Sequence, residues 1–287
     1  MNIGIGSYYE PAGENRYKPT AHAGGAWDPA ELHFSPLGGL VVHAIDQFVA
    51  GRAGEELVLS RISFDILGRL ALDECEIQVQ TLRPGRTIEL VEAVVLIGDR
   101  PVVRARAWLL STGDTSAVAG GGDGSRYKNE DGNGTGKTDK DSKDSKDSGR
   151  LTPPEKLASW SLTDVWPGGY ISSVDIRPVA PPQPGRTTAW IGTDLDLVAG
   201  QACSPLASFV ALVDTANGIA VWQSPTEWMF PNVDLTIHLH RQPEGRWTGL
   251  DTTVTFGPTG QGITSTVLHD VAGPVGHAEQ ILTVRPL

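Results

Sequence analysis

Cysteine is nearly absent from the 287-residue chain, which contains only Cys75 and Cys203. These two residues lack metal-ligand spacing, so neither a disulfide framework nor a zinc finger is expected, and a reducing cytosol is the default compartment. Apolar runs never approach the roughly 20 residues needed to cross a bilayer. Residues 1–10 lack a basic start followed by an apolar stretch, so no secretory signal is expected.

Positive charge is also scarce, because 23 Lys and Arg residues stand against 34 Asp and Glu residues, for a net charge of −11. This balance argues against a surface that binds nucleic acid. Apolar residues make up 39% of the chain, which is enough to build a core. We therefore expect an acidic, cytoplasmic protein with no membrane segment and no nucleic-acid partner.

One segment differs in composition from everything else. Residues 120–150 contain almost no apolar residue and are rich in Gly, Asp, Lys, Ser and Asn. Such a stretch cannot bury enough surface to offset its chain entropy, so a disordered linker is expected. The predicted division is a first domain at 1–118, the linker at 119–152, and a second domain at 153–287. A modified or partner-binding tail is the alternative interpretation of this segment.

The two halves repeat one helical pattern. The run from Ser35-Pro36 to Asp46 recurs as Ser204-Pro205 to Asp214. Proline suits the first position of a helix because its missing N–H would have no partner there. Each run is apolar nearly all the way round, which predicts a buried helix.

The segments after each helix have the character of β-strands. Residues 74–81 and 234–240 alternate between apolar and polar side chains, which predicts half-buried strands. Further β-branched runs cover 86–97, 102–110, 248–256, 262–269 and 275–284. A curved antiparallel sheet wrapped round each buried helix satisfies this pattern. The expected fold is α+β, a double hot-dog with its two sheets joined edge to edge.

Short motifs in both halves resemble those of the TesB-like acyl-CoA thioesterases. In the first half these are Leu37-Gly38-Gly39, then residues 82–87 (LRPGRT) and residues 104–108 (RARAW). In the second half they are residues 212–214 (LVD), 233–241 (VDLTIHLHR) and Glu279-Gln280. The resemblance covers nearly all of the chain outside the linker. It implies a double hot-dog enzyme of fatty acid metabolism that hydrolyses acyl-CoA without a cofactor or metal, as a monomer or a homo-oligomer.

The resemblance also implies which residues activate water. Its Asp position falls on Asp214, its Gln position on Gln280, and its Thr or Ser position on Asn232, where a carboxamide replaces the hydroxyl. The glutamine that often follows the Gly-Gly pair is replaced by Leu40.

The residues themselves leave alternatives open at each of these positions. Asp214 is a carboxylate in an apolar run, where burial would raise its pKa toward that of a useful base; alternatively, it caps the local turn. Gln280 could orient a water or be an ordinary polar strand residue. Asn232 follows Pro231 and could be a turn residue.

Several further residues are candidates for binding the substrate. The starts of the two buried helices offer backbone N–H groups for an oxyanion, so Gly38, Gly39, Ala207 and Ser208 are expected there. Anionic coenzyme A needs local cations, for which Arg83, Arg86 and Arg241 are the candidates, although each could equally form a structural salt bridge. An acyl channel could use one or two tryptophans of the second half: Trp160, Trp166, Trp190, Trp222, Trp228 and Trp247.

Other functions fit the sequence less well. His238 and His240 share a strand face, but no third metal ligand is evident near them, so no metal site is expected. A hot-dog hydratase would need an Asp and a His about five residues apart at the helix start, and neither half shows that pair. The lost hydroxyl at Asn232 and the residue Leu40 keep a second hypothesis open, in which the chain is a non-catalytic acyl-CoA-binding or assembly protein.

Overall fold

The computed structural model describes residues 6–50, 57–120 and 149–287. Most of the predicted linker, residues 121–148, lies outside the described residues, so its disorder stays a prediction. None of the helices in the described part of the chain combines the length and the apolar character that crossing a bilayer requires.

In the first half a buried helix is followed by four long strands, of which the sequence predicted the last three. Its elements are β1 (Ser7–Gly13), β2 (Arg16–Pro19), η1 (Ala21–Ala23), α1 (Phe34–Ala50), β3 (Leu57–Ile66), β4 (Cys75–Arg83), β5 (Ile88–Ile97), β6 (Arg100–Ser111) and η2 (Ser116–Val118). Gly98 has φ +60° in the tight turn between β5 and β6, where glycine adopts a left-handed conformation at no steric cost. The strands predicted over 74–81, 86–97 and 102–110 are confirmed to within a few residues.

The second half also ends in four long strands, as predicted. Its elements are η3 (Pro154–Lys156), α2 (Gly169–Ser173), β7 (Val174–Pro178), β8 (Arg186–Thr193), β9 (Asp196–Val198), α3 (Pro205–Val210), η4 (Val213–Thr215), α4 (Ala216–Ile219), β10 (Trp228–Met229), β11 (Asp234–Leu239), β12 (Thr248–Phe256), β13 (Gln261–Asp270), β14 (Gly273–Thr283) and β15 (Arg285–Pro286).

The second buried helix is broken, whereas the repeat predicted one continuous helix. It begins as expected, because the Ser204 side chain caps α3 and Pro205 takes the first position. After Val210 the chain tightens, and the N–H of Leu212 bonds to the carbonyl of Phe209 three residues back. Hydrogen bonds between residues three apart in the sequence are typical of a 3₁₀ turn. Asp214 therefore lies in the short turn η4 and not in a helix that continues α3.

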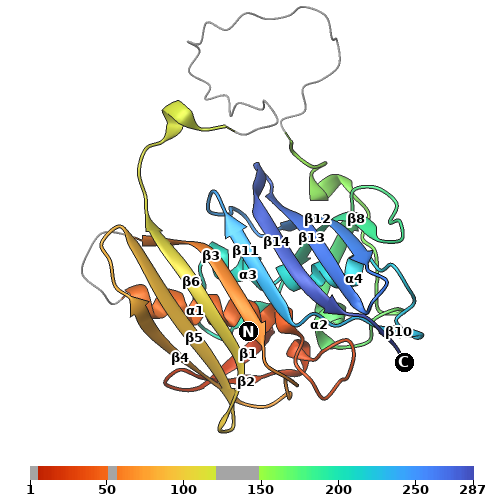
Figure 1. The fold of residues 1–287 in the computed structure, drawn as a ribbon, viewed down its shortest axis with the longest axis horizontal. Coiled ribbons are helices and arrows are strands. Elements are labelled where there is room, and N and C mark those ends of the chain that lie inside the picture. The colour runs from red at the N-terminus through yellow and green to blue at the C-terminus, as the bar shows by residue number, and fades with distance from the viewer. Residues whose placement is uncertain (1–5, 51–56, 121–148) are drawn as a thin grey trace, which may run out of the picture.

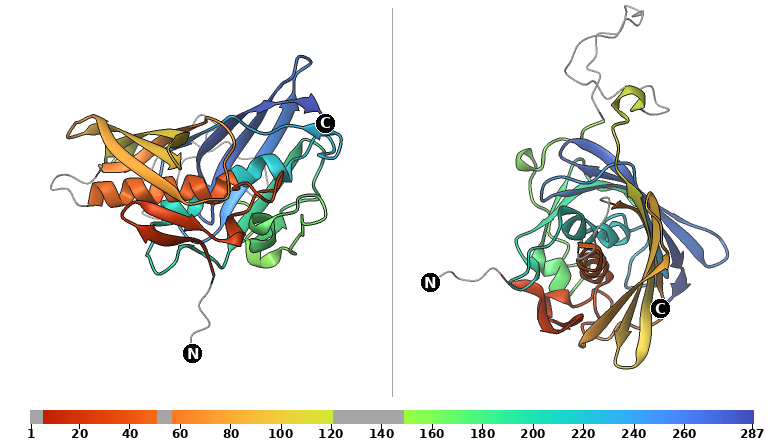
Figure 2. Two further views of the ribbon diagram at one scale, coloured as in Figure 1. Left: turned by 90° about the horizontal axis from the view of Figure 1, so that it is seen from below. Right: turned by 90° about the vertical axis from the view of Figure 1, so that its left-hand side faces the viewer.

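The two halves share one sheet of 13 strands, ordered β7-β8-β12-β13-β14-β11-β3-β6-β5-β4-β2-β1-β9. The expected edge between the two sheets is the antiparallel pair of β3 and β11, in which Phe64 faces Leu235. Because this edge is hydrogen-bonded, the sheet is continuous and not split in two. At its far end β9 of the second half pairs in parallel with β1 of the first, a pairing that the sequence did not predict. Figures 1 and 2 show the sheet curving round the helices.

The core is built on α1, which is buried along its whole first part, from Phe34 to Ile45. A helix with apolar residues on all sides needs partners on all sides, and α1 finds them in the concave face of the sheet and in α3. The contact with α3 depends on Gly39. A Cβ atom added there would lie 2.5 Å from Ala211 Cβ and 2.6 Å from the Ala207 carbonyl oxygen.

Gly39→Ala is therefore expected to destabilise the fold, by about 2 kcal/mol, because overpacking forces backbone shifts. Gly38→Ala is the matched control. A Cβ atom at Gly38 would meet its nearest neighbour, Phe34, at an ordinary 3.5 Å, and alanine favours a helix over glycine. Urea denaturation of both variants measures the difference. Equal free energies of unfolding would contradict the packing role of Gly39.

Candidate active site

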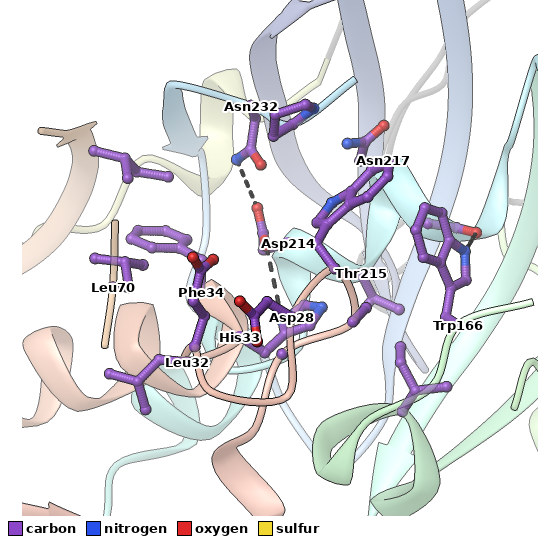
Figure 3. Close-up of a pocket in the computed structure, with 18 of the residues that line it drawn as sticks. Asp28, Leu32, His33, Phe34, Leu70, Trp166, Asp214, Thr215, Asn217 and Asn232 are labelled. Carbon is purple, nitrogen blue, oxygen red and sulfur yellow. Dashed lines mark hydrogen bonds and ion pairs between the residues drawn. The ribbon is translucent and has the colours of Figure 1, made fainter. Parts of the chain in front are cut away.

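The structure brings together the three residues that the resemblance singled out. Asp214 on η4 accepts two hydrogen bonds at Oδ1, one from Gln280 Nε2 on β14 at 2.6 Å and one from Asn232 Nδ2 at 2.8 Å. Asn232 lies just before β11, bridged to Leu282 of β14. Strand β14 thus supplies Gln280, the segment before β11 supplies Asn232, and the turn η4 supplies the carboxylate. Figure 3 shows Asn232 bonded to Asp214.

Both amides bind the same oxygen of Asp214, so the other one is left for chemistry. Oδ2 accepts no hydrogen bond from any of the described residues, and His33 Nδ1 lies 3.9 Å from it. Gln280 is 2% exposed and lies behind the carboxylate, since it is not among the described residues that line the adjoining cavity. Its amide nitrogen donates to the carboxylate, and the role of orienting a water stays a prediction.

Burial sets the proton affinity of Asp214. The side chain is enclosed by protein, and loss of solvent raises its pKa from 3.8 to about 7, although the donors Asn232 and Gln280 act in the opposite direction. A carboxyl group of this pKa is partly ionised at neutral pH and can take up a proton there. The environment thus matches that of a general base.

A cavity of about 190 Å³ opens in front of Asp214, between the two halves of the chain. One wall comes from residues 25–34 and 66–70, and the other from residues 166–171, 214–218 and 231–232. Its apolar lining includes Leu32, Phe34, Leu70 and Ile171 together with Trp27 and Trp166, whose rings meet edge to face at 4.8 Å. Such a lining suits an acyl group.

Two residues of the site carried no signal in the sequence. His33 lines the cavity immediately before α1, and its ring stacks on Tyr170 with the ring centroids 4.1 Å apart. Tyr170 is fully buried on α2, and its hydroxyl bonds to Thr215 Oγ1 at 2.6 Å. Thr215 directly follows Asp214, so this stack supports the turn that carries the carboxylate. The contacts join three distant segments, which no local pattern could indicate.

Two family profiles match the chain over most of its length. Residues 24–110 match the N-terminal domain of acyl-CoA thioesterases, and residues 151–284 match their C-terminal domain. The chain belongs to the acyl-CoA thioesterase family. A search of curated proteins finds no match for it.

Solved structures show the same fold at low sequence identity. A hot-dog protein of unknown function from Alicyclobacillus acidocaldarius superposes with a TM-score of 0.64 at 12% identity, covering 96% of this chain and 95% of that one. The acyl-CoA thioesterase II TesB2 of Mycobacterium marinum gives 0.57 at 13% identity, covering 97% and 96%. The tesB protein of Mycobacterium avium subsp. paratuberculosis gives 0.60 at 12% identity, covering 97% and 96%. The chain therefore has the hot-dog fold.

The residues near the two helix starts that were predicted to hold an oxyanion have backbone N–H groups that are bonded within the protein. Gly38 and Gly39 lie more than one turn inside α1, where N–H groups bond within the helix. The Ala207 N–H donates to Ser204 Oγ at 3.0 Å, and the Ser208 N–H to the Ser204 carbonyl at 3.1 Å. These four residues are not among those that line the cavity. Because their N–H groups are already bonded, they are left out of the candidate site.

The predicted cations are also not among the described residues that line the cavity. Arg83 is the last residue of β4 and Arg86 lies in the loop that follows; both are exposed, and Arg83 Nη1 donates to the Ile88 carbonyl at 2.8 Å. Arg241 forms a bidentate ion pair with the buried Asp270. All three are therefore left out of the candidate site as well. The cavity rim instead carries Arg69, which is paired with Asp28 and Glu31.

Among the described residues, no group of three or more His, Cys, Asp or Glu side chains is arranged to bind a metal ion. Leu40, the residue in place of the glutamine, is fully buried in α1.

Proposed function

We propose that this protein hydrolyses fatty acyl-CoA with Asp214 as the general base that activates water. The observation that carries the proposal is the asymmetry of the carboxylate. Two amides hold Oδ1, while Oδ2 accepts no hydrogen bond from the residues that the structure describes, and Asp214 lines an apolar cavity that suits an acyl chain. The raised pKa of Asp214 supports the same role.

The reaction follows from this geometry. Asp214 Oδ2 accepts a proton from a water molecule as the water oxygen attacks the thioester carbonyl carbon. The C–O bond forms and the carbonyl oxygen becomes an oxyanion. The tetrahedral intermediate then collapses, the C–S bond breaks, and the departing thiolate takes the proton that Asp214 holds. The products are a fatty acid and coenzyme A, and the carboxylate is restored.

In this mechanism Asn232 and Gln280 act on the base. Their N–H groups fix the carboxylate plane and keep Oδ2 toward the cavity. Asn232 is itself held, because Nδ2 also donates to the Asp234 carbonyl at 3.1 Å. The Asn232 carboxamide can therefore replace the Thr or Ser hydroxyl of the family in donating a hydrogen bond to the aspartate.

Thiol release tests the proposal. The full chain is incubated with acyl-CoAs of increasing chain length, and a thiol-reactive dye records free coenzyme A. Saturable release supports hydrolysis, and the chain-length profile reports the reach of the cavity. Tight binding of an acyl-CoA without thiol release would favour the alternative, a non-catalytic acyl-CoA-binding protein on the same fold.

A further inference from the structure

The proposed reaction needs a group that stabilises the oxyanion, and the helix-start residues expected from the sequence do not supply it. Their N–H groups are bonded within α1 or to Ser204. Such a donor must lie near Asp214 Oδ2, because only the attacking water molecule separates that oxygen from the thioester carbonyl. His33 is next to that oxygen, because its Nδ1 atom lies 3.9 Å from Oδ2 and the residue lines the same cavity.

The hydrogen bonding of His33 determines which ring nitrogen carries its proton. Nδ1 accepts the backbone N–H of Ser35 at 3.2 Å, as a capping side chain does at a helix start. A nitrogen that accepts has no proton of its own, so a neutral ring carries its proton on Nε2. Nε2 has no hydrogen-bond partner among the described residues, while His33 itself lines the cavity (Figure 3).

The position of the His33 ring and its protonation state are both fixed by its surroundings. Stacking on the buried Tyr170 holds its plane, and the backbone N–H of His33 donates to the Ala23 carbonyl at 2.8 Å. Burial lowers the pKa of His33 to about 3, so the imidazole is neutral at every pH at which Asp214 works. Its contact with Asp214 is therefore not an ion pair. A neutral, preorganised imidazole is a good donor to a carbonyl oxygen that gains negative charge.

We propose that His33 is a catalytic residue whose Nε2–H donates to the carbonyl oxygen of the bound thioester and stabilises the oxyanion. The proposal rests on the proposed hydrolysis by Asp214. It assigns His33 two tasks through its two nitrogens: Nδ1 caps α1 and Nε2 serves the reaction.

Two substitutions separate these tasks. In His33→Asn the side-chain oxygen can take the place of Nδ1 and keep the cap, but no donor reaches the position of Nε2. In His33→Gln the amide nitrogen reaches approximately the position of Nε2, while the cap is lost. We expect kcat to fall by about 10²–10³-fold in His33→Asn, as for loss of one oxyanion donor, and by no more than about tenfold in His33→Gln. KM and the pH midpoint of kcat should be unchanged.

Several results would overturn the proposal. A His33→Asn variant with wild-type kcat would leave only the capping role. A shift of the pH midpoint with an unchanged plateau would mean that His33 acts through Asp214. Wild-type protein that releases no thiol would refute the hydrolytic function and, with it, this role.

A spectroscopic measurement needs no His33 variant. Isotope-edited infrared spectroscopy of Asp214→Asn with acyl-CoA labelled with ¹³C at the thioester carbonyl reports a bound but unreacted carbonyl. We expect the carbonyl band to shift to lower frequency on binding, because His33 donates to the oxygen. An unshifted band would contradict the proposal.

Discussion

Replacing Asp214 by asparagine is expected to lower kcat about 10³-fold, because general base catalysis contributes typically 10²–10⁴-fold. The change is nearly isosteric. The asparagine oxygen can accept the hydrogen bonds that Asn232 and Gln280 now donate to Oδ1, so the fold around the site should be preserved. What is lost is the oxygen that faces the cavity and takes the proton from water. Steady-state thiol release with a saturating acyl-CoA measures the loss.

Asp46→Asn is the matched control for this experiment. Asp46 ends the first copy of the repeat, as Asp214 ends the second, and lies on α1, where its Oδ2 accepts a hydrogen bond from Ser204 at 2.6 Å. It does not line the cavity in front of Asp214, so kcat should stay at the wild-type value. Equal activity of Asp214→Asn and Asp46→Asn would remove Asp214 from the mechanism.

The Asp214→Asn substitution is also expected to stabilise the folded protein at alkaline pH. Burial raises the pKa of Asp214 from 3.8 to about 7. Between these values the folded state keeps a proton that the unfolded state releases, so stability from this group falls as pH rises. A shift of this size corresponds to about 4 kcal/mol once the pH exceeds 7, at about 1.4 kcal/mol per pKa unit. Asparagine does not ionise and avoids this penalty.

Urea denaturation at pH 5 and pH 8 measures this effect. Asp214→Asn should exceed the wild type in free energy of unfolding at pH 8, and the difference should shrink toward pH 5. A difference that is the same at both pH values would mean that the pKa of Asp214 is not raised by folding. Gain of stability with loss of activity is typical of a buried catalytic charge.

Local patterns were sufficient to predict most of the strands. Residues Leu235 and Ile237 are fully buried on β11, as their alternation with polar residues indicated. The same reasoning singled out Asp214, since a carboxylate in an apolar run must be paired or functional. The break after Val210 was not predictable in this way, because apolar content does not distinguish an α-helix from a 3₁₀ turn.

Long-range contacts account for what the sequence could not indicate. His33 enters the site only because α1 of one half meets η4 of the other, and Tyr170 reaches it from a third segment. Gly39 resembled part of a binding motif, but its small size serves the contact between α1 and α3. A glycine that allows close approach has the same appearance in a sequence whether its neighbour is a ligand or a helix.

Titration of the Asp214 carboxyl carbon by ¹³C NMR is the sharpest test of Asp214 as the base, and the Asp214→Asn spectrum identifies the signal. We expect a midpoint near pH 7 and a kcat that rises with pH through the same midpoint to a plateau. A carboxyl group that titrates near pH 4, or a kcat whose midpoint does not follow it, would contradict the assignment of Asp214 as the base.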